Sequence, residues 1–361
     1  MATRPLFTRF PMGLQTTYSE LKQRAFEQEA LLLGTPGSVS ERTESGRQYF
    51  YRQFYDSEAS KATEYIGPVD DENAARRAEL LRARIADANA LIAMTQLLAG
   101  VGYVQTDART QAVLVVLANA HLFRGGALVI GSHAYGAILN DLGTKVAAFA
   151  TEDVDIARAG PLTIAAEPRV PFADVLASSR VPLLPIPSLD RKGPATSFAV
   201  PPRLRGKSRL RVDLLAPVSG GEARPVAVPE LGAHAMGLPH LLYLLEGPVD
   251  SVVLGKNAVV PVKVPRPERL AWHKAITSEL RADTSDKKQK DLDQAAVLIA
   301  ILSEDAPESL LDAHAALSAS SRSKVTRAAD GLLARLSVAG HERAVELVRE
   351  VVGTRPASKR R

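Results

Sequence analysis

Apolar and polar residues follow different periods along the chain, and the changes of period divide it into three parts. Residues 16–34 and 73–98 repeat apolar positions at helical spacing, while residues 48–66 between them alternate aromatic and polar side chains as a β-hairpin does. The pattern is helical again after residue 271. We therefore expect a helical and β-hairpin extension over 1–105, an α/β core over 106–268 and a C-terminal helical domain with a basic tail over 269–361.

The middle part reads as alternating helices and short buried strands. "DARTQAVLVVLANAHLF" predicts a helix, "GGALVIG" a strand, and "SHAYGAILNDLG" a helix capped by Ser132 and closed near Gly143. "KVAAFATEDVDIARA" predicts a strand whose end carries two aspartates, and "SRLRVDLLAP" a further strand of the same sheet. The Pro-rich stretch 161–205 between them is interpreted as an insertion across one face. Five helices are expected after it, at 271–282, 286–304, 307–319, 321–337 and 340–352.

The amino-acid composition excludes several classes of functional site but does not identify one. The chain has 361 residues, of which 46% are hydrophobic and 24% charged, as in ordinary globular proteins. It has no cysteine, so disulfides, thiolate zinc sites and cysteine nucleophiles are excluded. No apolar stretch predicts a signal peptide or a membrane span, so we expect a cytoplasmic protein with no membrane partner. The net charge of +5 favours polyanionic partners only weakly.

Two aspartates one residue apart are the first candidate for chemistry. In a strand, Asp153 and Asp155 project to the same face, where each raises the pKa of the other unless a cation lies between them. Asp213 on the next strand, with Arg211 and Leu215 on its own face, would bring a third carboxylate. Such a set can hold Mg²⁺ ions that bind a triphosphate. The ordinary alternative is a solvated strand end.

Gly131 and Ser132 are the second candidate. A strand that ends in Gly-Ser at the start of a helix exposes backbone N–H groups and a hydroxyl that can bind phosphate oxygens. The alternative is a plain helix cap.

Taken in order, these segments resemble a known family. "LVIGSHAYGAIL", "FATEDVDIA" and "LRVDLL", over about residues 125–216, resemble the motifs of the polymerase β-like nucleotidyltransferase superfamily, and the chain as a whole resembles a group of bacterial proteins with that fold. The resemblance implies an α/β (α+β) nucleotidyltransferase core in which Gly131 and Ser132 bind triphosphate and Asp153, Asp155 and Asp213 bind metal. Tyr135 departs from it, because many members carry a basic residue there.

The C-terminal helices carry a further polar set. Lys274, Ser278 and Arg281 share one helical face, and Lys287, Lys290, Asp291 and Gln294 form a polar stripe on the next helix. Their order is similar to that of the abortive-infection and toxin nucleotidyltransferases, which implies a phosphate contact for Lys274 and a role as base or orienting group for Asp291. His133 and His273 are expected to be structural, and Trp272 a packing anchor.

These features together predict an enzyme. The expected reaction, dependent on Mg²⁺ or Mn²⁺, transfers a nucleoside monophosphate from an NTP to an acceptor hydroxyl and releases pyrophosphate. Two alternatives stay open: a toxin-like enzyme that modifies tRNA or protein, and an inactive nucleotide- or RNA-binding module. The aromatic hairpin can stack nucleobases, although packing against the core or a partner subunit is the interpretation that the sequence favours. The aromatic residues of this hairpin are Tyr49, Phe50, Tyr51, Phe54 and Tyr55. The oligomeric state is left open.

Overall fold

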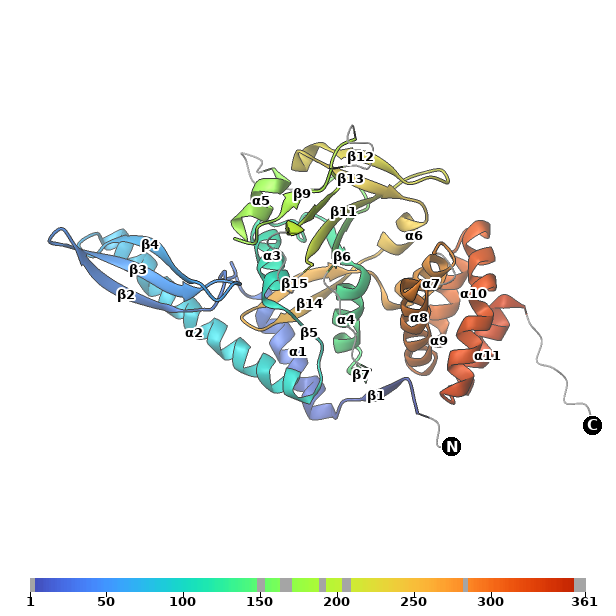
Figure 1. Ribbon diagram of the computed structural model, residues 1–361. Helices are drawn as coiled ribbons and strands as arrows, with labels where there is room; N and C mark the ends of the chain where they lie inside the picture. The colour runs from blue at the N-terminus through green and yellow to red at the C-terminus, as the bar shows by residue number, and fades with distance from the viewer. Residues whose placement is uncertain are drawn as a thin grey trace, which may run out of the picture.

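The protein has a mixed α+β fold, shown in Figure 1. The computed structural model describes residues 4–147, 153–162, 171–187, 193–202, 209–281 and 285–353. In these residues the strands form four sheets, one of seven strands, two of three and one of two. The predicted α/β class is therefore right at the level of a mixed α+β fold.

The seven-stranded sheet carries the candidate carboxylates. β8 (Asp153–Arg158) and β11 (Arg211–Pro217) are parallel neighbours, so the two strands that flank the Pro-rich stretch share one sheet, as predicted. β6 (Ala127–Ile130) pairs antiparallel with the other edge of β8. All four β6 residues are buried, which explains the continuous apolar run in its sequence. The sheet is completed by β9 (Leu184–Pro185), β10 (Ser197–Ala199), β12 (Arg224–Val228) and β13 (Ala233–Leu238), with the short helices α5 (Phe172–Ser178), η2 (Pro229–Leu231) and α6 (Leu241–Leu245) in its connections.

The central helices pack beside this sheet. α3 (Ala108–Asn119) begins at Asp107, whose carboxylate accepts hydrogen bonds from the amides of Arg109 and Thr110. α4 (Gly131–Asp141) follows β6 without an intervening loop. The smaller sheets are formed by β5 (Gln105–Thr106), β14 (Val249–Gly255) and β15 (Val259–Val264), and by β1 (Phe7–Arg9) and β7 (Thr144–Val146).

Within the N-terminal part, residues 38–68 and the start of the helix that follows them project from the body as an arm (blue to cyan in Figure 1), whereas residues 12–26 pack in the body. This long helix, α2 (Glu72–Val101), was predicted over nearly the same residues. The predicted hairpin is present as β3 and β4, and a third strand, β2, extends it to a sheet. The remaining helix, α1, begins and ends earlier than its pattern indicates. The bounds are Met12–Phe26 for α1, Ser38–Glu44 for β2, Arg47–Tyr55 for β3 and Lys61–Pro68 for β4.

Five helices form the C-terminal bundle, close to the predicted segments. Prolines stand in the first turns of two of them, where the missing N–H costs nothing. Trp272 is fully buried and donates from Nε1 to the carbonyl of Leu310 at 2.9 Å, as its predicted anchoring role requires. The bundle and the seven-stranded sheet share one continuous apolar cluster. The helices are α7 (Pro267–Ser278), α8 (Asp286–Asp305), α9 (Pro307–Ala315), α10 (Ala319–Val338) and α11 (Glu342–Val352).

Two local predictions were wrong. α4 is preceded by Ile130 and has no side-chain cap, so Ser132 lies within its first turn instead of capping it. β8 begins at Asp153, so the aspartates lie at the start of a strand, not at its end. Of the predicted strand over "KVAAFATEDVDIARA", the described residues form β7 and β8, which belong to different sheets, and residues 148–152 lie outside the described part of the chain.

Candidate functional site

The carboxylates of two neighbouring strands form the centre of the site. Asp155 of β8 and Asp213 of β11 are register partners, which places the two residues side by side. Burial, and after it the negative charge of Asp213, raises the pKa of Asp155 to about 7. Asp153 precedes Asp155 by two residues on β8 and pairs in register with Arg211 of β11. A cation between Asp155 and Asp213 would relieve this repulsion.

Asp213 is held in place by two side chains. Arg211 donates from Nε to Oδ1 of Asp213 at 2.7 Å, and the hydroxyl of Ser197 on β10 donates to the same oxygen. The Arg211 guanidinium also donates to the Ser197 hydroxyl at 2.9 Å. Ser197 was missed by sequence reasoning because it lies in the Pro-rich stretch, where no motif marks it.

Gly131 is required at its position for two independent reasons. Its φ of +68° lies in the left-handed region, which side chains other than glycine rarely adopt. In addition, a Cβ at this position would overlap Oδ2 of Asp155. The close approach puts the first turn of α4 directly against the acid pair. Ser132, which is only 9% exposed, lies at the same end of the helix.

Positive charge comes from the C-terminal bundle. Asp291 of α8 is 3% exposed and accepts from Nζ of Lys274 at 2.8 Å and from Nε of Arg281 at 2.5 Å. Burial opposes ionisation of this carboxyl, but Lys274 and then Arg281 lower its pKa below the ordinary value. Asp291 therefore stays ionised and fixes both cations.

A cavity of about 340 Å³ brings the two sets together. Acids from the sheet and cations from α7 and α8 line it, and the exposed Lys287 and half-buried Lys290 stand at its border. The structure thus gathers every predicted site residue: Gly131, Ser132, Asp153, Asp155, Asp213, Lys274 and Asp291.

The described residues do not bring three or more carboxylate or imidazole side chains close enough to form a ready metal site. Two facing carboxylates still suit Mg²⁺, which is commonly bound by one or two protein carboxylates together with phosphate oxygens and water. The oxygen donors and the raised pKa of Asp155 fit such an ion. Metal binding by Asp153, Asp155 and Asp213 stays a prediction.

The histidines near the site are neutral. His133 is 8% exposed, and burial lowers its pKa to about 4. The half-buried His273 lines the cavity, and burial, followed by the charge of Lys274, lowers its pKa to about 3. Neither histidine belongs to a group of potential metal ligands in the described residues.

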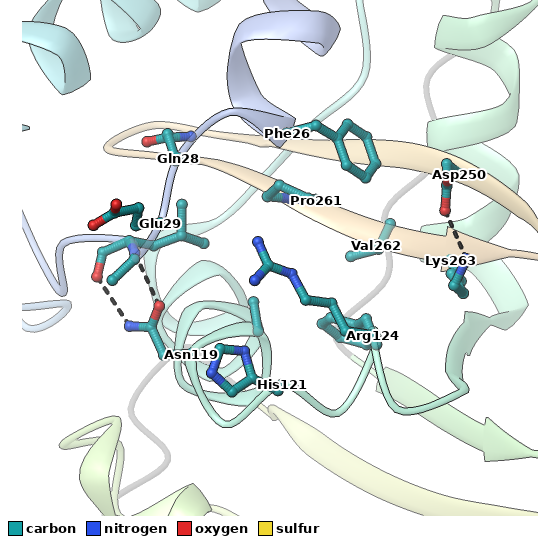
Figure 2. Close-up of a pocket in the computed structure, with 14 residues that line it drawn as sticks. Phe26, Gln28, Glu29, Asn119, His121, Arg124, Asp250, Pro261, Val262 and Lys263 are labelled. Carbon is teal, nitrogen blue, oxygen red and sulfur yellow. Dashed lines mark hydrogen bonds and ion pairs between the residues drawn. The ribbon is translucent and has the colours of Figure 1, made fainter. Parts of the chain in front are cut away.

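A second cavity, of about 300 Å³, lies away from these residues (Figure 2). Arg124 points into it above His121, and Asp250 pairs with Lys263 at its border at 2.8 Å. It contains none of the predicted site residues. The chemistry predicted from the sequence therefore belongs to the cavity between the sheet and the bundle.

Acids facing cations across one cavity, beside the start of a helix, are what a protein needs to bind a metal-complexed polyphosphate. The chain belongs to a nucleotidyltransferase family, whose model matches residues 108–319. This span covers more than half of the chain, and it includes every predicted site residue. Comparison with curated proteins and with solved structures gives no match. No helix in the described ranges is long and apolar enough to cross a membrane.

Proposed function

We propose that the protein transfers a nucleoside monophosphate from an NTP to an acceptor hydroxyl and releases pyrophosphate. The observation that carries this proposal is the cavity in which Asp155 and Asp213 face Lys274 and Arg281. Family membership supports nucleotidyl transfer as the general activity. The succession of β6, α4, β8 and β11 supports a core of the polymerase β-like type.

Mg²⁺ or Mn²⁺ would be held by Asp155 and Asp213, with Asp153 completing the set. The bound ion would neutralise triphosphate charge and stabilise the leaving pyrophosphate. Ser132, the amides of the first turn of α4 and the Lys274 ammonium would bind the triphosphate oxygens.

Asp291 acts in this scheme as a positioning residue. Each of its carboxylate oxygens already accepts a hydrogen bond from a cation, and its pKa is lowered, so it is a poor proton acceptor. Of the two roles left open by the sequence, base and orienting group, the second is therefore the better supported. Its charge keeps Lys274 and Arg281 directed at the cavity.

Bond changes in the reaction balance without an oxidant or reductant. The acceptor oxygen forms a bond to the α-phosphorus, and the bond from that phosphorus to the bridging oxygen breaks. Pyrophosphate leaves with the electron pair. The acceptor proton passes to Asp213, whose Oδ1 is engaged by Arg211 and Ser197, so Oδ2 is the oxygen assigned to this step.

The test measures transfer of label from each α-labelled NTP, with Mg²⁺ or Mn²⁺, to cellular RNA or protein. Asp155→Asn and Asp213→Asn should abolish transfer, because each removes a carboxylate from the pair. Asp250→Asn is the matched control, since Asp250 is an exposed partner of Lys263 beside the second cavity. Equal transfer by wild type and the Asp155→Asn variant would refute the proposal.

A further inference from the structure

Only one face of the three-stranded sheet in the arm packs against α2. On the inner face of β3, Phe50 and Phe54 are 6% and 4% exposed, and Phe50 packs with Ala74 and Ala78 of α2. Figure 1 shows α2 running along this one side of the three-stranded sheet. The alternate residues of β3 belong to the opposite face. The expected packing is thus confirmed within the chain for the two phenylalanines, whereas for the tyrosines the alternative of packing against a partner subunit stays a prediction.

Three tyrosines gather on this outer face. The ring centroids of Tyr49 and Tyr51 lie 5.9 and 5.5 Å from that of Tyr65 on β4. Tyr65 is 56% exposed, and Tyr55, further along the same face of β3, is 53% exposed. A cluster of large, solvent-exposed aromatic side chains indicates a binding surface.

Arginines accompany the rings. The guanidinium carbon of Arg42 lies 5.3 Å from the ring centroid of Tyr51, and that of Arg47 lies 5.8 Å from the ring of Tyr49. Lys61 stands opposite Tyr55 in the β3–β4 register. Glu44 on β2 accepts a hydrogen bond from the Tyr51 hydroxyl at 3.0 Å, and Asp70 pairs with Arg47 at 2.9 Å. Within the strands, this face therefore carries three positive residues and one negative residue, while Asp56, Glu58 and Asp70 lie beyond the strand ends.

We propose that this outer face binds single-stranded nucleic acid, with bases stacked on Tyr49, Tyr51 and Tyr65 and phosphates beside Arg42, Arg47 and Lys61. Every base has a flat face that can stack on tyrosine, and a polyanion complements the basic border. A protein partner is less well matched, because polar Ser40, Gln53 and Thr63 share this face with the tyrosines and break up its apolar surface.

The arm also contacts the body at the start of α3. Glu58, in the β3–β4 turn, forms an ion pair with Arg109 at the start of α3. Asp107, the cap of that helix, lines a cavity of about 240 Å³ together with Ser132. A strand that follows the tyrosines toward this turn approaches the site. The idea that this strand serves as the acceptor rests on the proposed function, whereas the binding of the strand to the arm does not.

Fluorescence anisotropy with labelled oligonucleotides tests the proposal. We expect single-stranded RNA or DNA to bind more tightly than a duplex, and Tyr65→Ala to weaken binding roughly 5- to 150-fold, the loss of one stacked base. Tyr65→Trp should retain binding because it keeps a stacking surface. Arg42→Gln should lower the salt dependence of binding. Phe26→Ala, at an exposed aromatic residue outside the arm, is the matched control.

Two outcomes would overturn the inference. The first is no preference for single strands, or equal binding by wild type and a folded Tyr49→Ala/Tyr65→Ala variant. The second is a wild-type dimer in sedimentation that these substitutions convert to monomers, which would assign the face to a second copy. The Asp155→Asn variant separates this proposal from catalysis, since it should bind oligonucleotides normally whether or not the enzyme transfers nucleotides.

Discussion

Neutralising Asp291 tests whether the cations of the site are held by a buried charge. Asp291 is 3% exposed and Lys274 is 7% exposed, so Asp291→Asn leaves the Lys274 ammonium without its counter-charge in a place that water hardly reaches. Removing one partner of a buried pair costs about 3–5 kcal/mol of stability. Lys274→Met should cost less, about 1–3 kcal/mol, because Asp291 keeps the hydrogen bond from Arg281.

Urea unfolding measures these changes, and the single tryptophan, Trp272, reports on them from the same helix as Lys274. The Lys274→Met/Asp291→Asn double variant should lose clearly less than the sum of the single variants, because the uncompensated charge disappears. The exposed pair Lys263–Asp250 provides the matched cycle, in which a coupling below about 1 kcal/mol is expected. If Asp291→Asn costs no more than Asp250→Asn, the reasoning is refuted.

Two further predictions concern the first turn of α4. Gly131→Ala should abolish transfer, because it adds backbone strain of about 1 kcal/mol and pushes a methyl group against Asp155. The control is Gly353→Ala, at a glycine with a similar φ of +72° and open space around it, which should leave activity unchanged. An active Gly131→Ala enzyme would contradict the packing argument. Burial lowers the pKa of His133 to about 4, although the charge of Asp107 opposes the shift, and this value lies below the unfolded value of about 6.5. The unfolded chain therefore binds more protons between these values, so this contribution to stability is complete above pH 6.5 and falls by about 3 kcal/mol as the pH drops through 4. Thermal unfolding between pH 7.5 and 4 should show a shallower pH dependence for His133→Gln, and parallel curves for the two proteins would argue against a buried neutral histidine.

Long helical repeats and the paired strands were predictable because their signals are local. α2 has an aspartate cap and a glycine in the left-handed conformation at its end, and prolines set the starts of α7 and α9. The pairing of Asp155 with Asp213 followed from two short strands whose acids stand at equivalent positions. For these elements, sequence and tertiary structure favour the same answer.

Other features depend on contacts that no local pattern reports. β2 has one apolar residue, Val39, in seven, so its place beside β3 is set by pairing and not by hydrophobic alternation. Ser132 has the residue type of a cap, but the left-handed turn at Gly131 starts the helix one residue earlier. Ser197 reaches Asp213 only because β10 pairs with β11 across a stretch that has no motif of its own.

The acids and the cations of the site belong to different parts of the protein, and this division determines how the site forms. The acids lie on strands of the sheet, which are fixed by their ladder, whereas the cations lie on α7 and near its end, and are fixed by Asp291 of α8. The bundle packs on the sheet through one continuous apolar cluster, so the cavity exists only when the two parts are docked. Substitutions in that shared core, far from any phosphate, should therefore reduce nucleotide binding together with stability. Exposed substitutions on the outer face of the bundle should affect neither.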